Sequence, residues 1–295
     1  MSEEEKSETI TGSQCSAASG NTGYSGRTGH TGHTGNTLCA EGLQVGYRTS
    51  RTEVTPVLRD VSAVIPPESL TVILGPNACG KSTLLRTLAG LLTPQQGRVS
   101  LGGEALATLR PAVLARQLSL LPQQPPIPEG ITVFDLVARG RYAHQSFFAQ
   151  WSPADAEAVT EALRRTGLDE LGGRAVETLS GGQRQRCWIA LALAQDTGLM
   201  LLDEPTTYLD VAHQVEVLRL LESLRAEGRT IVAVLHDLNH AARWATHLIA
   251  MREGRIHAAG PPAEVFTAET VQELFGMPCR VIEDPDTGSP VVLPR

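Results

Sequence analysis

The stretch GPNACGKST, from Gly75 to Thr83, matches the GxxxxGK(S/T) pattern of phosphate-binding loops. It lies between a short apolar run, SLTVIL, and a segment with helical character, which is the context that the pattern requires. In such a loop the glycines let backbone N–H groups turn toward phosphate oxygens, and the helix N-terminus adds positive potential. We expect Lys81 to reach the β- and γ-phosphates of a nucleotide and the Ser82 hydroxyl to ligate Mg²⁺. The alternative, a glycine-rich turn that binds nothing, is disfavoured by this context.

Two carboxylates and a histidine lie at the ends of later apolar runs. Asp203 and Glu204 end LMLLDE, and His236 ends TIVAVLH. One carboxylate can hold Mg²⁺, and its neighbour can polarise a water for in-line attack on a γ-phosphate. Adjacent acids are common on protein surfaces, so this pair gains its meaning from the phosphate loop. His236 could donate to the γ-phosphate, although a strand-end histidine is by itself more often an ordinary hydrogen-bonded residue.

A second phosphate cradle is predicted at LSGGQRQR, Leu179 to Arg186. Ser180, Gly181 and Gly182 would present a hydroxyl and a helix N-terminus, which are good partners for a γ-phosphate. Alone, this stretch would be read as a capped helix with a flexible start. The chain has one nucleotide loop, however, so we expect this element to contact a nucleotide that another copy of the chain holds.

These residues must be positioned by an α/β core. The short apolar runs Ser69–Leu74, Leu199–Asp203 and Thr230–His236 predict strands buried on both faces. Helices are predicted between them, one from Lys81 to Leu92 and one ending near Gly228. The second helix has an apolar face at i, i+3, i+4 and i+7, made of Val217, Leu220, Leu221 and Leu224. Alternating strands and helices predict a parallel sheet covered on both faces.

The flanking and inserted regions differ from this core. The stretch from Thr132 to Gln195 is nearly all helical in character, with Ser152 as a helix cap before Pro153, and we place a helical insert at about residues 125–195. Residues 1–37 repeat a Thr-Gly unit with almost nothing apolar, which predicts a disordered tail. Its histidines are read as polar spacer and not as metal ligands. Residues 38–295 form the predicted domain, with a C-terminal extension at about 262–295.

Composition excludes several classes of protein. The chain has 295 residues and a net charge of −7 with no basic run, so nucleic acid is a poor partner. Its five cysteines form no CxxC pair, which argues against a disulfide framework or a zinc site and fits a reducing compartment. The longest apolar run, CWIALALA, is far shorter than the roughly 20 residues of a membrane-spanning helix.

The ordered motifs GPNACGKST, LLPQQ, LSGGQRQR, LMLLDEPTTYLD and VLHDLN resemble those of the ATPase subunit of an ABC transporter, from about Leu38 to the C-terminus. The resemblance implies a P-loop NTPase fold of the ABC ATPase type. This α/β fold has a mostly parallel core sheet, an antiparallel β subdomain and an inserted helical subdomain. It also implies ATP and Mg²⁺ as cofactors. The nucleotide-binding positions of the loop would be Gly75, Pro76, Asn77, Ala78, Cys79, Gly80, Lys81, Ser82 and Thr83.

The family pattern implies catalytic roles elsewhere. Asp203 would be the Walker B aspartate, ligating Mg²⁺ together with Ser82, and Glu204 would be the catalytic carboxylate. His236 would be the switch histidine. Gln123, in LLPQQ, would be the Q-loop residue that joins Mg²⁺ and the attacking water to the transmembrane partner.

Further positions would contact the nucleotide from outside the loop. Tyr47, in LQVGY, matches the aromatic residue that stacks on adenine, the alternative being a strand-end tyrosine. Asp210, in TTYLD, matches the D-loop aspartate that communicates across the dimer. The signature motif of a second copy would contribute Ser180, Gly181, Gly182 and Gln183.

The loop departs from the family at one position. Family members usually have a third glycine where this chain has Ala78. If the position needs a positive φ, alanine costs roughly 1 kcal/mol or more. We expect function to survive, and ATP affinity is the property that the substitution puts in question.

A finer resemblance is to ATPase subunits of iron–siderophore importers of the ferric citrate and enterobactin type, with haem and cobalamin importers as alternatives. It rests on ARQLSLLPQ, EGITVFDLVARGRYAH, LLDEPTTYLD and VLHDLNHAARW. It implies two copies beneath two transmembrane permease subunits at the cytoplasmic face of the membrane. A periplasmic or lipoprotein solute-binding protein would be an indirect partner. The GITVFDLVARGR helix would lie where the permease docks, and it would also pack inside the helical subdomain.

Two other classes remain as alternatives. A soluble ABC-type ATPase acting on ribosomes or DNA ends is disfavoured, because the chain has a single cassette and no sustained heptads. A regulatory nucleotide-binding module without turnover is disfavoured by the intact Glu204 and His236.

Overall fold

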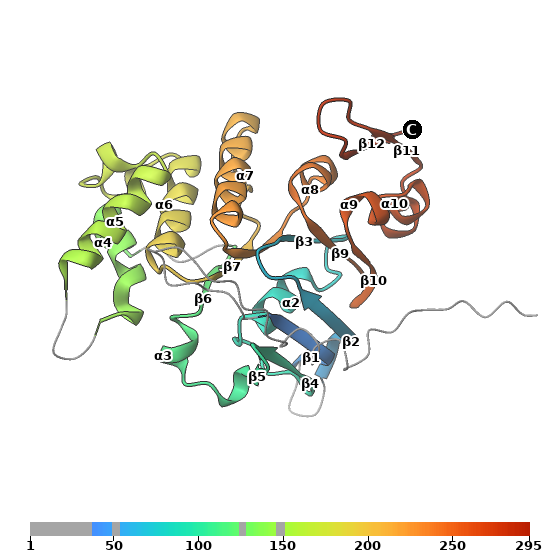
Figure 1. The fold of residues 1–295 in the computed structure, drawn as a ribbon, viewed down its shortest axis with the longest axis horizontal. Coiled ribbons are helices and arrows are strands. Elements are labelled where there is room, and N and C mark those ends of the chain that lie inside the picture. Colours follow the sequence, from blue (N-terminus) through green and yellow to red (C-terminus); the bar gives the residue numbers. More distant parts are fainter. Residues whose placement is uncertain (1–36, 49–53, 124–127, 146–150) are drawn as a thin grey trace, which may run out of the picture.

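The computed structural model describes residues 37–48, 54–123, 128–145 and 151–295. The tail predicted at residues 1–37 therefore lies outside the described residues, apart from Thr37. In Figure 1 the helices α4, α5 and α6 stand at one end, the antiparallel strands β1, β2, β4 and β5 lie below the centre, and the C-terminal elements lie at the other end. No helix in the described part of the chain is long and apolar enough to cross a membrane.

The central sheet is mostly parallel. Its order is β10-β9-β3-β8-β7-β6, and only the β9–β10 pair is antiparallel. Its strands are β3 (Leu70–Leu74), β6 (Leu118–Leu121), β7 (Leu199–Asp203), β8 (Thr230–Val234), β9 (His247–Arg252) and β10 (Arg255–Gly260). All residues of β3, β7 and β8 are buried, which confirms the three strands predicted from apolar runs. Parallel strands need long crossovers, and helices supply them here.

Two smaller sheets flank the central one. An antiparallel sheet of order β2-β1-β4-β5 contains β1 (Leu38–Arg48), β2 (Val54–Ile65), β4 (Gln96–Leu101) and β5 (Glu104–Ala105). A C-terminal hairpin pairs β11 (Cys279–Glu283) with β12 (Pro290–Pro294). The parallel core sheet and the separate antiparallel sheet confirm the predicted α/β fold class.

Helices fill the crossovers and the region between β6 and β7. The described α-helices are α2 (Lys81–Leu88), α3 (Pro111–Leu114), α4 (Val133–Ala138), α5 (Pro153–Arg165), α6 (Gly181–Ala194), α7 (Val211–Ala226), α8 (Leu238–Trp244), α9 (Pro262–Val265) and α10 (Ala268–Phe275). Short 3₁₀ helices lie at Leu106–Thr108, Arg139–Ala143, Asp169–Leu171 and Val176–Thr178. The helices α4, α5 and α6, which lie between β6 and β7, pack against one another.

The two faces of the central sheet bury different sets of residues. Along β7, Leu199 and Leu201 pack with the antiparallel sheet and α2, whereas Met200 and Leu202 pack with α6 and α7. This alternation is the period of two that a strand imposes on its side chains. Burial on both faces explains why these strands have continuous apolar sequences.

Two helices differ in detail from the predictions. The first was expected to run from Lys81 to Leu92, but α2 ends at Leu88 because Gly90 adopts a φ of +73°, which favours helix termination. The second, α7, buries Leu218 in place of the predicted Leu220, which is only partly buried. The cause is its tertiary setting, since α7 presents a slightly rotated face to the core.

Candidate functional site

The phosphate loop joins β3 to α2 and is held in shape by the backbone and by Lys81. A side-chain carbon at Gly75 would lie 2.2 Å from the carbonyl oxygen of Met251, and the φ of Gly75 is +147°, so only glycine fits. The Lys81 ammonium donates to the carbonyl oxygens of Gly75 and Pro76, both at 2.9 Å. Lys81 is buried, and these two hydrogen bonds hold its ammonium against the backbone of the loop.

Ala78 occupies a backbone conformation that favours glycine. Its φ is +62°, in the left-handed region. Position 78 therefore does need a positive φ, and alanine is expected to cost roughly 1–2 kcal/mol of backbone strain there.

Replacing Ala78 by glycine is expected to raise the free energy of unfolding by up to about 1 kcal/mol. Relief of strain exceeds the entropy that glycine returns to the unfolded chain, which is about 0.4–1 kcal/mol. Urea denaturation of both proteins without nucleotide measures the difference. An Ala89→Gly variant, at a position with a φ of −78°, is the matched control and should be destabilised. A destabilised Ala78→Gly protein would show that the loop carries no strain at this position.

Asp203 lies at the end of β7 beside the start of α2. The Ser82 hydroxyl donates to its Oδ1 at 2.9 Å. Its second oxygen, Oδ2, is buried without a hydrogen-bond partner among the described residues. Burial raises the pKa of Asp203 above its usual range, although the Ser82 hydrogen bond acts in the opposite direction. A buried carboxylate oxygen that lacks a hydrogen-bond donor can be satisfied by a bound cation.

Asp203→Asn is expected to stabilise the nucleotide-free protein by about 1 kcal/mol at neutral pH. Because the folded pKa is raised, the folded state binds this proton more tightly than the unfolded state. The carboxyl therefore costs stability once the pH rises through the window between the unfolded and folded pKa values. Urea denaturation at neutral pH and near pH 4 measures this: the gain should be present at neutral pH and shrink in acid. A gain of equal size at both pH values would exclude the carboxyl charge as its cause.

Glu204 follows directly and has several partners from distant segments. The Nε2 atom of His236 lies 2.6 Å from its Oε1, and the Thr207 hydroxyl donates to its Oε2 at 3.0 Å. The Gln123 side chain forms a further hydrogen bond with it. Burial favours the neutral acid, but these hydrogen bonds and the charge of His236 outweigh burial and lower the pKa of Glu204. The carboxylate is therefore ionised at neutral pH and can act as a base toward water.

The backbone also contributes to this arrangement. Glu204 has a φ of +56°, a conformation that costs about 1–3 kcal/mol and persists only where the surroundings enforce it. Thr207 was not among the residues predicted from the sequence. A hydroxyl three residues after a turn glutamate is the signal that could have found it, since such short-range pairs are common in turns.

Tyr47 lies near the end of β1, beside the phosphate loop. Its hydroxyl lies 3.3 Å from the Thr83 hydroxyl, and the residue is 41% exposed. The structure thus brings a partly exposed aromatic ring next to the loop, where adenine stacking is possible.

The second cradle is a capped helix start. The Ser180 hydroxyl accepts from the backbone N–H of Gln183 at 3.2 Å, and the Gln183 side chain accepts from the backbone N–H of Ser180 at 3.1 Å. This capping box leaves Ser180 and Gly181 exposed. In the described part of the chain, no hydrogen bond joins this segment to the phosphate loop of the same copy.

Asp210 caps α7 close to the second cradle. It accepts from the backbone N–H of His213 at 2.9 Å and lies 2.7 Å from the Nδ1 atom of the same residue. The preceding segment packs on α6, because Gln185 donates to the carbonyl oxygen of Pro205 at 3.1 Å. Asp210 and the start of α6 therefore belong to one surface.

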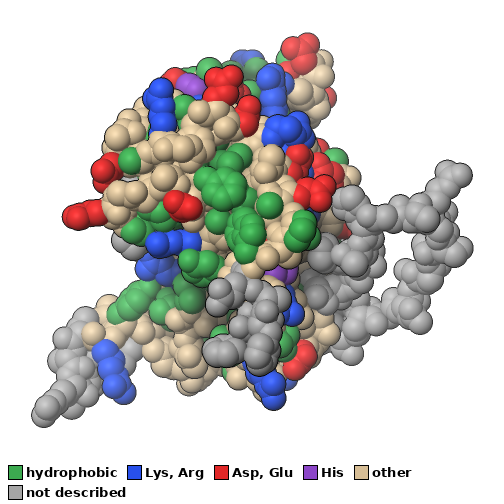
Figure 2. Space-filling model, turned by 90° about the vertical axis from the view of Figure 1, so that its left-hand side faces the viewer, with side chains coloured by type: hydrophobic (Ala, Val, Ile, Leu, Met, Phe, Trp, Pro, Cys, Tyr) green, Lys and Arg blue, Asp and Glu red, His purple; other side chains and the backbone are tan. Residues whose placement is uncertain are grey.

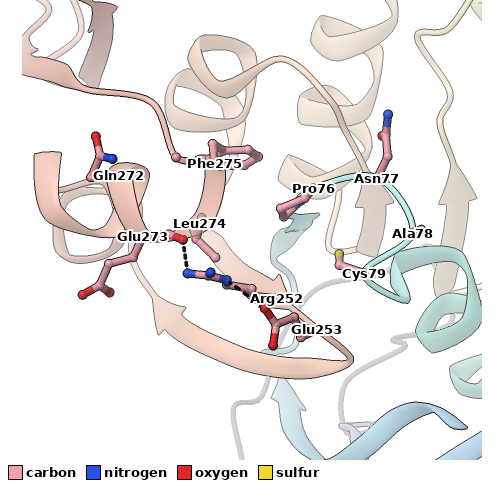
Figure 3. Close-up of a pocket in the computed structure, with 11 residues that line it drawn as sticks. Pro76, Asn77, Ala78, Cys79, Arg252, Glu253, Gln272, Glu273, Leu274 and Phe275 are labelled. Carbon is pink, nitrogen blue, oxygen red and sulfur yellow. Dashed lines mark hydrogen bonds and ion pairs between the residues drawn. The ribbon is translucent and has the colours of Figure 1, made fainter.

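A cavity of about 460 Å³ lies beside the phosphate loop. Figure 3 shows the loop residues Pro76 to Cys79 on one side and α10 on the other, with the β9–β10 turn between them. The guanidinium group of Arg252 donates to the backbone carbonyl oxygen of Glu273, which ties α10 to the turn.

A second cavity, of about 530 Å³, lies on the helical segment and has exposed aromatic residues in its lining. Phe134 is 36% exposed, Trp151 45% and Tyr142 64%, and the rings of Phe134 and Trp151 lie 6.2 Å apart. Figure 2 shows hydrophobic side chains gathered in the middle of the face that this end of the molecule presents. We call this surface, defined by Phe134, Tyr142 and Trp151, the aromatic groove.

Comparison with known proteins identifies the family. The sequence profile of the ABC transporter family matches residues 58–207. The chain belongs to the ABC transporter family. It is an ATP-binding, ATP-hydrolysing cassette, a class in which hydrolysis is coupled to transport.

Relatives and solved structures agree with this assignment. The ferric enterobactin transport ATP-binding protein of Escherichia coli is 52% identical over 81% of this chain and 88% of the relative. A siderophore transport system ATP-binding protein of Bacillus subtilis is 49% identical over 88% of this chain and 92% of the relative. Among structures, an inward-facing metal-chelate type ABC transporter has a TM-score of 0.74 at 28% identity and covers 88% of this chain and 98% of its own. A dimeric bacterial ABC transporter cassette has a TM-score of 0.68 at 25% identity, covering 76% and 98%.

Proposed function

We propose that this chain is the subunit that binds and hydrolyses ATP to power import of an iron(III)–siderophore complex through an ABC transporter. For hydrolysis, the proposal is carried by the ionised Glu204 held between His236, Gln123 and Thr207, next to the Ser82–Asp203 pair. For the cargo, it is supported by the identity of about half of the residues with siderophore transport proteins.

The site fits Mg²⁺ bound together with nucleotide phosphates. The unpartnered Oδ2 of Asp203 and the Ser82 hydroxyl are hard oxygen donors, which Mg²⁺ prefers, and Gln123 lies close enough to Glu204 to contribute as well. In the described part of the chain, no group of three or more His, Cys, Asp or Glu side chains could hold a metal by itself. This agrees with an ion that takes most of its ligands from phosphate and water. When bound, Mg²⁺ would neutralise charge that develops on the phosphates.

Each residue of the site then has a task. Tyr47 stacks on the adenine, and the backbone from Gly75 to Thr83 surrounds the phosphates, with Lys81 shared between the β- and γ-phosphates. Glu204 orients and polarises the attacking water. His236 keeps Glu204 in place and would donate to the γ-phosphate.

A second copy completes the site. Among the described residues, the helix start at Ser180 does not bond to the phosphate loop of its own chain, and its exposed residues Ser180 and Gly181 would face the nucleotide of a partner copy. A structural neighbour is a dimeric cassette, and another is the same cassette after hydrolysis with ADP and phosphate bound. Asp210 lies on the same surface and would contact the partner copy.

The aromatic groove is the proposed contact with two permease subunits. Its exposed rings are typical of a protein interface. The Gln123 side chain, which forms a hydrogen bond with Glu204, would couple the permease contact to the catalytic carboxylate. The chain would thus act at the cytoplasmic face of the membrane as a peripheral subunit. A periplasmic or lipoprotein solute-binding protein would be reached only through the permease, and nucleic acid is not a partner.

Tyr142→Ser is expected to weaken docking to the permease by about tenfold or more while leaving nucleotide binding unchanged, because an exposed aromatic anchor is lost. Co-purification with the permease in detergent measures this. Leu91→Ser, at a residue 65% exposed near the end of α2, is the matched control and should dock normally. If Tyr142→Ser docks like the unaltered protein, the groove is not the contact.

Transport measurements test the cargo. Vesicles that contain the chain, its permease and the solute-binding protein should take up a ferric siderophore only with MgATP inside. Cobalamin is the competing cargo, since a cobalamin import ATP-binding protein of Halobacterium salinarum is 39% identical over 88% of this chain. Haem is a third possibility in the same assay. Uptake of cobalamin or haem without uptake of any ferric siderophore would overturn the proposed cargo, whereas phosphate release inside the vesicles with no uptake of any cargo would favour a soluble ATPase.

A further inference from the structure

The helix that follows His236 is too short to hold its own position. His236 lies between β8 and α8, and Asp237 caps α8 by accepting from the backbone N–H of His240 at 2.7 Å. The helix has seven residues, below the roughly 12 needed for a helix to be even marginally stable alone. The orientation of His236 toward Glu204 therefore depends on whatever fixes α8.

The C-terminal hairpin supplies that fixation through Asn239. The Asn239 side chain accepts from the backbone N–H of Val292 at 2.8 Å and donates to the carbonyl oxygen of the same residue at 3.4 Å. An antiparallel strand directs the polar groups of alternate residues to opposite edges, so Val292 turns its N–H and C=O away from β11 and toward α8. The Asn239 side-chain amide thus pairs with both backbone polar groups of Val292 on the outer edge of β12.

Two further contacts hold the hairpin and α8 together. The Val292 side chain is 3% exposed and belongs to the main apolar cluster, which also contains Ala241 and Ala242 of α8. One turn beyond Asn239, the Nη1 atom of Arg243 lies 3.7 Å from Oδ2 of Asp284, in the hairpin turn. In Figure 1, β12 lies next to α8 at the C-terminal end of the molecule.

We propose that Asn239 is a positioning residue for hydrolysis and that the β11–β12 hairpin is the brace against which it acts. The hairpin fixes α8 through Asn239, α8 fixes His236, and His236 fixes Glu204. The inference rests on the proposed function for its effect on turnover, but its structural part, the orientation of His236, does not.

A double-mutant cycle tests the proposal on the purified full-length chain. Asn239→Leu, which keeps the side-chain size, should lower kcat for MgATP hydrolysis about tenfold with KM changed less than about twofold, because a reacting group is misplaced while nucleotide contacts remain. In a His236→Ala background the same change should have no further effect on kcat. Equal losses in both backgrounds, or no loss in the first, would overturn the proposal.

A second measurement separates this inference from the proposed function. The imidazole NMR resonances of His236, assigned by their absence in His236→Ala, should move in Asn239→Leu even without nucleotide. They should be unchanged in Gln272→Leu, a control at an exposed amide of α10. Resonances that do not move in Asn239→Leu overturn the inference. A wild-type protein without phosphate release overturns the proposed function instead.

Asn239→Asp covers the case in which the leucine variant does not fold. It keeps an acceptor for the Val292 N–H but loses the donor to the Val292 carbonyl oxygen. The fall in kcat should again disappear in the His236→Ala background, and a fall that persists there would contradict the proposal.

Discussion

Glu204→Gln is expected to bind MgATP, to lose hydrolysis by about a thousandfold and to accumulate as a dimer. Glutamine keeps the size of the side chain but cannot act as a base, and base catalysis contributes about 10²–10⁴-fold. In the wild type, one carboxylate oxygen of Glu204 bonds to His236 and the other accepts from Thr207. The glutamine amide has a single oxygen, so it can accept from His236 but not from Thr207 as well. Phosphate release, nucleotide binding and light scattering measure the three properties.

Glu161→Gln is the matched control for this variant. Glu161 is an exposed glutamate of α5 paired with Arg164 at 2.6 Å, so the same change of charge occurs away from the site. It should hydrolyse ATP normally and should not accumulate as a dimer. If Glu204→Gln remained a monomer in saturating MgATP, the two-copy site would be wrong, and normal phosphate release would remove Glu204 from its catalytic role.

Lys81→Met is expected to lower MgATP affinity by about 100-fold or more. Methionine has a similar length but no charge, and the loss removes charge-assisted hydrogen bonds to two phosphates, each worth about 1.5–3 kcal/mol. The carbonyl oxygens of Gly75 and Pro76 also lose their donor, so the loop itself should become looser. Isothermal titration calorimetry with MgATP measures the affinity.

Thermal unfolding gives an independent measure of the same loss. Ligand that binds only the folded state raises the unfolding midpoint, so MgATP should raise the midpoint of Lys81→Met much less than that of the wild type at the same concentration. Arg165→Met is the control. It also removes a cation, but Arg165 pairs with Glu227, and neither residue belongs to the phosphate loop. Equal stabilisation of Lys81→Met and wild type by MgATP would mean that Lys81 does not contact phosphate.

The sequence alone determined the features that depend on neighbours in the chain. Apolar runs located β3, β7 and β8, since burial on both faces requires them. Ser152 and Ser180 were expected at helix starts and both cap helices, because capping involves residues three apart. The order of motifs identified the family, and the profile match at residues 58–207 agrees.

Only the tertiary structure decided how distant residues meet. Glu204 contacts His236 and Gln123 from the segments that follow β8 and β6, and Asn239 contacts Val292, 53 positions away in the sequence. The positive φ of Ala78 is likewise imposed by the loop as a whole. Such contacts depend on strand order and on the rotation of each helix in the core, and no local pattern encodes these. For the same reason Leu218 rather than Leu220 became buried in α7.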